Sequence, residues 1–391
     1  MGCLAGKQGI EGIFGWIIAA HCPPPVIHCL WSFVFDMMYS FLLMALVLFQ
    51  QPQGIPPAPV KATWIENAFL TLESGRFPKI AAIAWWHENF DRSVLRIDSS
   101  RAALEAYRNG VAPASFVTRP RIRQNKLLPA LEGIYHGAFP DLGSTEDQVD
   151  ARRIHEFERL AGKPLAWVYF SNNWYGQIRF PINEVALINN MGRLPFIRMM
   201  PRSRFEESGP DPVYSLQRII DGAFDDELRQ WARDAAATGI PLLVEFGTEM
   251  NGDWFPWNGR YNGGAETQGY GDPALADGPE RFRDAYRHII ELCDSQGADN
   301  ITWFFHIDAY GAPEADWNQP RNYYPGDQYI DWLGVSVYGP QEAGEDYQEF
   351  GEILDDVYPV LLDLADKPVA VLEFAVTELG ARRRLSLAPN W

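Results

Sequence analysis

The sequence predicts a closed (β/α)8 barrel, in which eight parallel strands alternate with helices. Eight short apolar runs, the first starting at residue 80 and the last ending at residue 372, are mostly separated by stretches with helical spacing. The chain has 391 residues and is 47% hydrophobic, which is enough to bury the core of one large barrel. Most of the unusual polar residues follow the ends of the apolar runs, where barrels of this kind carry their active sites.

The predicted elements follow one another in a regular order. Residues 64–73 have helical spacing, and a helix over 100–108 has Ser99 or Ser100 as its N-terminal cap, followed by a basic connector over 118–126. The predicted strands cover 80–86, 130–139, 165–170, 195–199, 240–246, 301–305, 333–337 and 368–372. The remaining predicted helices cover 145–160, 182–190, 226–237, 279–296 and 347–364.

The first 60 residues differ in composition from the rest, so we expect an apolar extension over 1–60 ahead of a single barrel domain over 61–391. Residues 26–49 are almost entirely apolar, and a run of this length can span a bilayer. We therefore expect export or membrane anchoring through 26–49 and a secreted or membrane-anchored extracellular protein. An extension outside the fold that is not native coding sequence fits the composition nearly as well.

Composition and charge argue against several classes of function. The net charge of −18 disfavours nucleic acid and suits a neutral polysaccharide as partner. Four cysteines are too few for a disulfide framework in a chain of this length. Cys22 and Cys29, with the neighbouring His21 and His28, lack the spacing of common zinc fingers. We expect no metal, no cofactor and a monomer.

Two glutamates follow apolar runs at the ends of predicted strands. Glu249 comes after the run 240–246 and before a loop with Trp254, Phe255 and Trp257, and Glu373 directly follows the run 368–372. Cleavage of a glycosidic bond needs one acid that protonates the leaving oxygen and one carboxylate at the anomeric carbon, with flat rings against the sugar faces. A glutamate that only caps a sheet is the alternative for either residue alone. The pair, beside this aromatic loop, predicts glycosidic bond cleavage.

Further candidates come from other strand ends and loops. The aromatic residues that could stack on sugar rings are Trp174, Trp254, Trp257, Tyr310 and Trp317, and core packing is the alternative for each. His136 and His306 could bind sugar hydroxyls, although single histidines at such places are more often structural. Glu245 shares strand parity with Glu249 and should point inward, where Arg198 on the neighbouring strand is the candidate partner.

Residues ~62–118 and ~128–378 resemble glycoside hydrolase family 26, whose best-known members are β-mannanases. The stretch from Glu249 to Phe255, with the spacing E-x-N-G-x-W-F, is the most specific part of the resemblance. Four weaker stretches add to it through their order in the chain: 133–140 (GIYHGAFP), 194–200 (LPFIRMM), 331–338 (DWLGVSVY) and 371–374 (VLEF).

The resemblance implies a retaining (β/α)8 enzyme with Glu249 as acid/base and Glu373 as nucleophile. It also implies that Tyr338 hydrogen-bonds the nucleophile and that Trp254 packs a sugar at the cleavage point, with Asn251 in the same motif. The implied substrate is a β-linked polysaccharide. The first candidate is β-1,4-mannan, cleaved at internal bonds of the polymer. Mixed-linkage β-glucan, β-1,3-xylan and a barrel that binds carbohydrate without catalysis remain open.

The sequence departs from the family in two ways. Thr248 stands where the family usually has histidine, which bears on recognition near the sugar 2-hydroxyl, and Glu245 stands at a commonly basic position. In addition, residues 62–118 match the last helix–strand–helix unit of the family but come first here. This order indicates a circular permutation, in which strand 80–86 closes the barrel between strands 131–135 and 369–373. A tandem-gene junction or translated noncoding flanks are the alternative origins.

Overall fold

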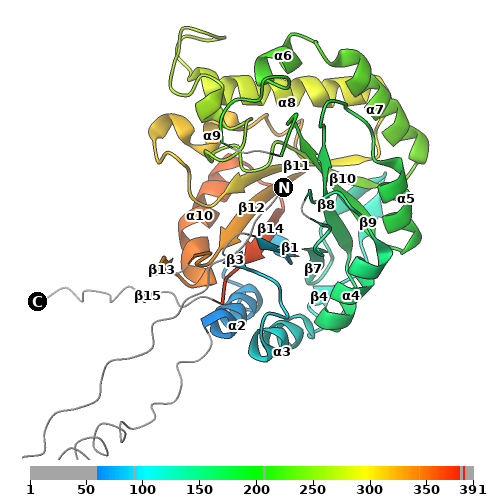
Figure 1. The fold of residues 1–391 in the computed structure, drawn as a ribbon, viewed down its shortest axis with the longest axis vertical. Helices are drawn as coiled ribbons and strands as arrows, with labels where there is room; N and C mark the ends of the chain where they lie inside the picture. Colours follow the sequence, from blue (N-terminus) through cyan, green and yellow to red (C-terminus); the bar gives the residue numbers. More distant parts are fainter. Residues whose placement is uncertain are drawn as a thin grey trace, which may run out of the picture. The chain divides into compact units, whose positions relative to one another are not determined.

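The computed structural model describes residues 60–90, 93–143, 145–205, 208–342, 344–378 and 382–383. Within these residues eight parallel strands form a closed barrel with helices arranged around it (Figure 1). The strands, in their order around the barrel, are β1 (Ile80–Trp86), β14 (Val369–Ala375), β12 (Trp332–Tyr338), β11 (Ile301–Asp308), β10 (Leu242–Phe246), β9 (Leu194–Met200), β8 (Trp167–Asn173) and β7 (Ile134–Phe139). The predicted (β/α)8 fold is confirmed.

The closing strand of the barrel is the first in the sequence. Strand β1 pairs with β14 on one edge, where Ile83 lies opposite Val371, and with β7 on the other, where Ile83 lies opposite His136. The predicted position of strand 80–86, between the strands near 131–135 and 369–373, is therefore confirmed. Closure leaves no unpaired edge on the barrel strands, which removes a common route to aggregation.

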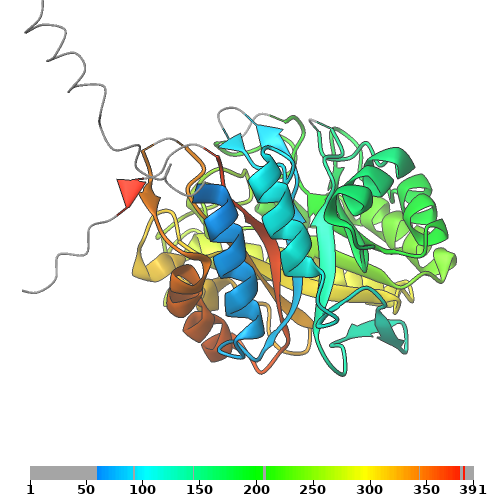
Figure 2. The ribbon, with the colours of Figure 1, turned by 90° about the horizontal axis from the view of Figure 1, so that it is seen from below.

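The barrel strands are almost continuously apolar because helices cover their outer face while side chains fill the interior. The helices that cover them are α2 (Val60–Glu73), α3 (Arg101–Val111), α4 (Ala151–Ala161), α5 (Ile182–Asn190), α7 (Asp225–Thr238), α8 (Asp277–Ser295) and α10 (Phe350–Leu364). Helices α2 and α3, blue and cyan in Figure 2, lie side by side. Of the two predicted caps for α3, the structure selects Ser100, whose hydroxyl accepts a hydrogen bond from the Ala103 N–H.

The prediction that a helix begins at residue 145 is wrong. Helix α4 begins at Ala151, where the Asp150 side chain caps it by accepting a bond from the Arg152 N–H. Before this cap the backbone turns sharply, and Glu146 has a φ of +62°. The turn directs Glu146 back over the barrel, with its carbonyl accepting a bond of 2.8 Å from the Ser171 N–H at the end of β8.

The predicted basic connector contains a hairpin that the sequence did not reveal. Strands β5 (Arg121–Arg123) and β6 (Lys126–Leu128) pair antiparallel, and the Leu127 N–H donates to the Thr302 hydroxyl at 2.8 Å near the start of β11. Because β11 begins there, the hairpin lies at the end of the barrel opposite the strand ends that carry the unusual polar residues. The smaller elements are β2 (Asn89–Phe90), β3 (Ser93–Val94), β4 (Phe116–Val117), β13 (Asp346–Tyr347), β15 (Arg382–Arg383), α6 (Leu216–Ile220), α9 (Pro320–Tyr323), η1 (Gly259–Tyr261) and η2 (Asp316–Asn318).

The predicted anchoring segment 26–49 lies outside the described residues, as does nearly all of the predicted extension over 1–60. Within the described part of the chain, no helix combines the length and the apolar character that a membrane crossing needs.

Candidate active site

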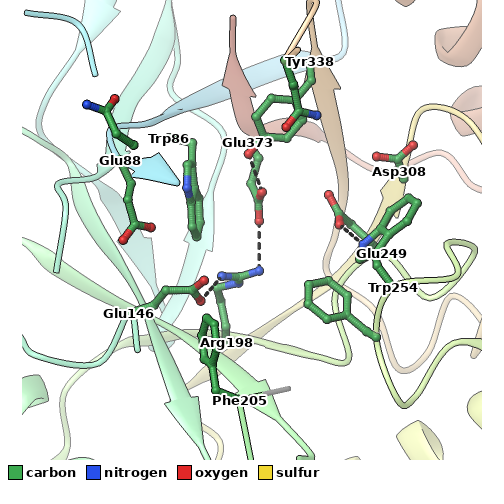
Figure 3. Close-up of a pocket in the computed structure, with 13 residues that line it drawn as sticks. Trp86, Glu88, Glu146, Arg198, Phe205, Glu249, Trp254, Asp308, Tyr338 and Glu373 are labelled. Atoms are coloured by element: carbon green, nitrogen blue, oxygen red, sulfur yellow. Dashed lines mark hydrogen bonds and ion pairs between the residues drawn. The ribbon is translucent and has the colours of Figure 1, made fainter. Parts of the chain in front are cut away.

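A cavity of about 550 Å³ opens at the C-terminal ends of the barrel strands (Figure 3). Five of the predicted site residues line it: Arg198, Glu249, Trp254, Tyr338 and Glu373. Eight further residues complete its wall: Trp86, Glu88, Asn89, Glu146, Phe205, Phe255, Asp308 and Gln341. The barrel thus brings side chains from strands far apart in the sequence to one opening, as this fold does generally.

The two predicted glutamates meet across this cavity. A carboxylate oxygen of Glu249, one of Glu373 and a ring nitrogen of His306 all lie within 4.8 Å of one another. Retaining glycosidases hold their two carboxyl groups about 5–5.5 Å apart, whereas inverting enzymes need about 6.5–9.5 Å to admit a water. The short separation matches the retaining geometry.

The loop after β10 positions Glu249 through its backbone and its side chain. Glu249 has a φ of +52°, a strained value for a residue with a side chain, and its N–H donates to the His306 carbonyl at 3.0 Å. The Trp254 ring N–H donates to the Glu249 carboxylate at 2.8 Å. A side chain at position 252 would collide with the Trp254 ring, since an added Cβ would lie 2.6 Å from it, so only glycine fits there.

Asn251 fastens this loop to the neighbouring strand. Its side-chain amide donates to the Asp308 carbonyl and accepts from the Asp308 N–H, both at 2.9 Å. Both partners belong to the last residue of β11, so the asparagine acts as a substitute for a further strand pair. The E-x-N-G-x-W spacing is therefore a structural unit that fixes one carboxylate.

Glu373 is held by two groups from other strands. The Tyr338 hydroxyl donates to one carboxylate oxygen at 2.8 Å, and Arg198 lies 3.2 Å from the other. Burial raises the pKa of Glu373 to about 7, although the Arg198 guanidinium works in the opposite direction. Glu373 is therefore balanced between its neutral and ionised forms near neutral pH.

Arg198 connects three acidic side chains beneath the cavity, and Figure 3 shows it between Glu146 and Glu373. The guanidinium lies 2.8 Å from Glu146, 3.5 Å from Glu245 and 3.2 Å from Glu373. It stacks over the Trp86 ring at 4.8 Å, measured to the ring centroid. The predicted contact between Glu245 and Arg198 is confirmed.

The two positions that depart from the family lie together and share a histidine. Glu245 and Thr248 both contact Nδ1 of His306, at 2.9 and 2.7 Å. The imidazole reaches both side chains from β11. His306 is fully enclosed, so a direct hydrogen bond from it to a sugar hydroxyl is excluded in this arrangement.

Three other predicted site residues are buried away from the cavity, so the structure does not bring them together with the two glutamates. His136 faces helix α3, with one ring nitrogen 3.0 Å from the Tyr107 hydroxyl and the other 3.0 Å from the Pro164 carbonyl. Trp174 is buried against Tyr214, with ring centroids 5.0 Å apart. Trp257 stacks on Phe255 and donates to the Thr248 carbonyl at 2.7 Å. Each packs behind the site because its side chain points toward the helices or the loop core.

Of the two remaining aromatic candidates, Tyr310 lies at a cavity and Trp317 does not. Tyr310 lines a second cavity that shares Trp254, Asp308, Tyr338 and Gln341 with the first, and its ring is 44% exposed. Trp317 lines neither of these two cavities.

Several cavity residues had escaped sequence reasoning. Trp86 and Glu88 end the first strand, so the rule that singled out Glu249 and Glu373 could have found them. Burial, reinforced by Glu146 and Asp141, raises the pKa of Glu88 to about 8. Glu146 was missed because the sequence pattern predicts a helix over 145–160, which gives no reason to expect its side chain at the cavity.

Phe205 follows β9 in a loop without pattern, and its exposed ring packs against Arg202. The sequence offered no signal for it. Asp308 is the last residue of β11 and lines both cavities. Burial and the nearby Glu249 charge raise the pKa of Asp308 well above its ordinary value.

Glu249, His306 and Glu373 are also close enough together to hold a metal ion. The ring nitrogens of His306 are engaged with Glu245, Thr248 and Ser336, however. A metal ligand needs a free lone pair on the ring, so this trio does not fit a metal site.

The known proteins to which this chain is similar carry the names of enzymes that cleave glycosidic bonds, the reaction that the two glutamates predict. Residues 215–365 match the model of a family described as glycosyl hydrolase family 26. The chain is 25% identical over 233 residues to Endoglucanase H of Acetivibrio thermocellus, an alignment that covers 59% of this chain and 23% of that protein.

Two further relatives are named for the cleavage of other polysaccharides. The chain is 27% identical over 164 residues to "Mannan endo-1,4-beta-mannosidase A and B" of Caldalkalibacillus mannanilyticus, covering 42% of this chain and 25% of the relative. It is 24% identical over 132 residues to Beta-1,3-xylanase TXYA of a Vibrio species, covering 34% and 24%. The chain thus spans about a quarter of the length of each relative.

Proposed function

We propose that the chain is a member of glycoside hydrolase family 26, whose model matches residues 215–365, and that it is a retaining hydrolase that cuts a β-linked polysaccharide at internal bonds. The observation that carries the proposal is the pair of glutamates whose oxygens lie within 4.8 Å across the cavity. This separation leaves no room for a water on the far side of the sugar, so the attacking group is a carboxylate.

In the proposed reaction Glu373 attacks the anomeric carbon and the bond from that carbon to the leaving oxygen breaks. Glu249 gives its proton to the leaving oxygen, and a covalent glycosyl ester of Glu373 remains. Glu249 then takes a proton from water, the water oxygen attacks the same carbon, and Glu373 leaves as a carboxylate. The Trp254 ring N–H, bonded to Glu249 at 2.8 Å, keeps that carboxyl group aimed at the leaving oxygen.

The first candidate substrate is β-1,4-mannan, supported by the relative named as a mannan endo-1,4-β-mannosidase. The second is a β-glucan, which two observations favour. Thr248 replaces the usual histidine near the sugar 2-hydroxyl, the group by which mannose and glucose differ, and the relative named Endoglucanase H aligns over 59% of this chain. A β-1,3-xylan is supported by the relative named as a xylanase.

The wall of the cavity favours neutral sugars over uronic acids. The guanidinium of Arg198 is the one cationic group that lines it, and this group is already paired with Glu146 and Glu373. A substrate carboxylate would therefore find no free cation among the lining residues. Polymers of this kind lie outside cells, so we also propose that the protein acts extracellularly, secreted or anchored, as a monomer.

Sugar release from mannan, glucomannan, lichenan and β-1,3-xylan tests the function and selects the substrate. Glu249→Ala and Glu373→Ala should lower kcat by orders of magnitude, while Glu132→Ala, an exposed glutamate away from the cavity, serves as matched control. Azide should restore turnover to both variants, giving a glycosyl azide of retained configuration with Glu249→Ala and of inverted configuration with Glu373→Ala. Polymer binding without any sugar release would favour the non-catalytic alternative.

We further propose that the strand order is a circular permutation of the family order. The two ends of the described barrel meet at one segment, which supports the idea. Lys61, near the start of α2, donates to the carbonyls of Val94 and Arg96 at 2.7 Å, and the Val94 N–H donates to the Thr377 hydroxyl at 3.1 Å. A short linker between the two ends would therefore close the chain into a continuous path.

A further inference from the structure

A layer of buried charge lies directly beneath the two catalytic candidates. Glu245 is 1% exposed, and one of its oxygens lies 2.9 Å from Nδ1 of His306. Its other oxygen accepts from the Tyr169 hydroxyl and lies 3.5 Å from Nε of Arg198. A carboxylate this deeply buried is tolerated only when cations and hydrogen-bond donors surround it.

The partners of His306 suit the charged form of its ring. Nδ1 faces the Glu245 carboxylate and the hydroxyls of Thr248 and Tyr169, and Nε2 faces the Ser336 hydroxyl at 2.9 Å. The carboxylate can only accept and so requires a proton on Nδ1, and the Ser336 hydroxyl can accept from a protonated Nε2, so an imidazolium fits these partners. Burial alone would lower the pKa of His306, but the Glu245 charge outweighs it and raises that pKa.

The same contacts hold Glu245 ionised. Burial works to raise the pKa of this carboxyl group, yet His306 first, and then Arg198 and Tyr169, bring the pKa below its ordinary value. The two partners thus stabilise each other's charges, as expected for a buried ion pair whose remaining hydrogen bonds are satisfied.

His306 interacts with titratable groups from several strands of the barrel. They are Tyr169 on β8, Glu245 on β10 with Glu249 in the loop that follows, and Glu373 on β14. The nearby cation is Arg198 on β9, which lies 3.5 Å from Glu245 and 3.2 Å from Glu373. A ring nitrogen of His306 lies within 4.8 Å of Glu373, close enough to favour the ionised form of that carboxyl group.

We propose that Glu245 and His306 form a buried ion pair that stays charged throughout the catalytic cycle and holds Glu373 ionised from below while Glu249 exchanges its proton. His306 is a positioning residue in this scheme, because it is walled off from the cavity and acts on the substrate only through the two carboxylates. The role in catalysis rests on the proposed hydrolase function, whereas the charge state of the pair does not.

The charge state is tested without any substrate, by nitrogen NMR of protein labelled at its seven histidines, with His306→Gln assigning the resonance. Both ring nitrogens of His306 should carry protons at pH 7, and the ring should lose one proton in Glu245→Gln. A wild-type ring with one bare nitrogen at pH 7 would overturn the proposal. If no polymer is cleaved at all, the proposed function fails but this result still stands on its own.

The catalytic role is tested by the pH dependence of kcat/KM on the polymer that the wild-type enzyme cleaves. Without the imidazolium, His306→Gln should move the acid limb upward by about one pH unit, equal to about tenfold lower kcat/KM on the acid side. His155→Gln, at an exposed histidine on α4, should leave the profile unchanged. A fall of equal size at every pH would mean a merely structural role and would overturn the proposal.

Ser336→Ala provides a second variant if His306→Gln fails to fold. It removes the acceptor at Nε2, 2.9 Å from the ring, and leaves the imidazole in place. The acid limb should move in the same direction by less than in His306→Gln. An acid limb that stays at the wild-type position in Ser336→Ala although the His306 ring has lost its charge would overturn the proposal.

Discussion

Removal of the Tyr338 hydroxyl tests the electrostatic control of Glu373 with the smallest possible change. Tyr338→Phe keeps the ring and deletes only the donor that lies 2.8 Å from the Glu373 carboxylate. A hydrogen bond to a charged group contributes about 1.5–3 kcal/mol. Because about 1.4 kcal/mol corresponds to a tenfold change in an ionisation constant, the loss should favour the protonated form of Glu373 by about ten- to a hundredfold.

The sign of the effect follows from the role of Glu373. Burial has already raised the pKa of this group to about 7, and a nucleophile must be ionised to attack. Loss of the donor raises the pKa further, so the acid limb of the profile of kcat/KM against pH should move upward by about one to two pH units. Well above the limb, where Glu373 is ionised in both proteins, the two rates should differ much less.

The assay is initial-rate hydrolysis of the preferred polymer from pH 5 to pH 10, with thermal unfolding at each pH to confirm that the variant is folded. Tyr324→Phe is a matched control, since its hydroxyl bonds Asp327 at 2.9 Å outside the cavity. If Tyr338→Phe lowered kcat/KM equally at every pH, the hydroxyl would act on positioning alone and the electrostatic argument would be refuted.

Three further predictions concern stability and chain order. Asn251→Ala removes the hydrogen-bond partners of the N–H and the carbonyl of Asp308, and each unsatisfied group lowers the stability by about 1–3 kcal/mol. The variant should therefore melt several degrees below wild type. Asn190→Ala, at an exposed position, should melt like wild type. Folded Glu88 keeps its proton to about pH 8, whereas the unfolded chain releases it near pH 4.5, so wild type loses stability across that window and Glu88→Gln does not. The gap in melting temperature between Glu88→Gln and wild type should therefore widen from pH 5 to pH 8, and a constant gap would contradict this. The last prediction concerns a rearranged chain that starts at residue 114, runs to residue 378 and continues through a short linker into residues 60–112. This chain should fold and retain activity. A product that does not unfold cooperatively would count against the permutation.

The elements that local sequence determines were predictable. The barrel strands are buried on both faces and therefore appear as apolar runs, which is why all eight were found near their observed positions. Glu249 and Glu373 could be singled out because Glu373 directly follows such a run and Glu249 comes three residues after one. The position of strand 80–86 followed from the need to close the barrel.

The errors arose where long-range contacts decide the structure. His136 lies within β7 and Trp174 directly follows β8, but only the register of the assembled barrel decides which side chains face the cavity. Glu146 was assigned to a helix because nothing local reveals the bonds to Ser171 and Arg198 that hold it over the barrel. The hairpin over 121–128 looked like a basic connector because its partners, Thr302 and Asp331, come much later in the chain.

The position of β1 also has a consequence for synthesis. The strand leaves the ribosome first, yet one of its two partners is β14, which is translated almost a full domain later. Until then an apolar strand with an unsatisfied edge is exposed to other nascent chains, a state that favours aggregation and chaperone capture. Production of this protein should therefore depend more on the rate of translation and on chaperone supply than production of a barrel whose neighbouring strands emerge in succession.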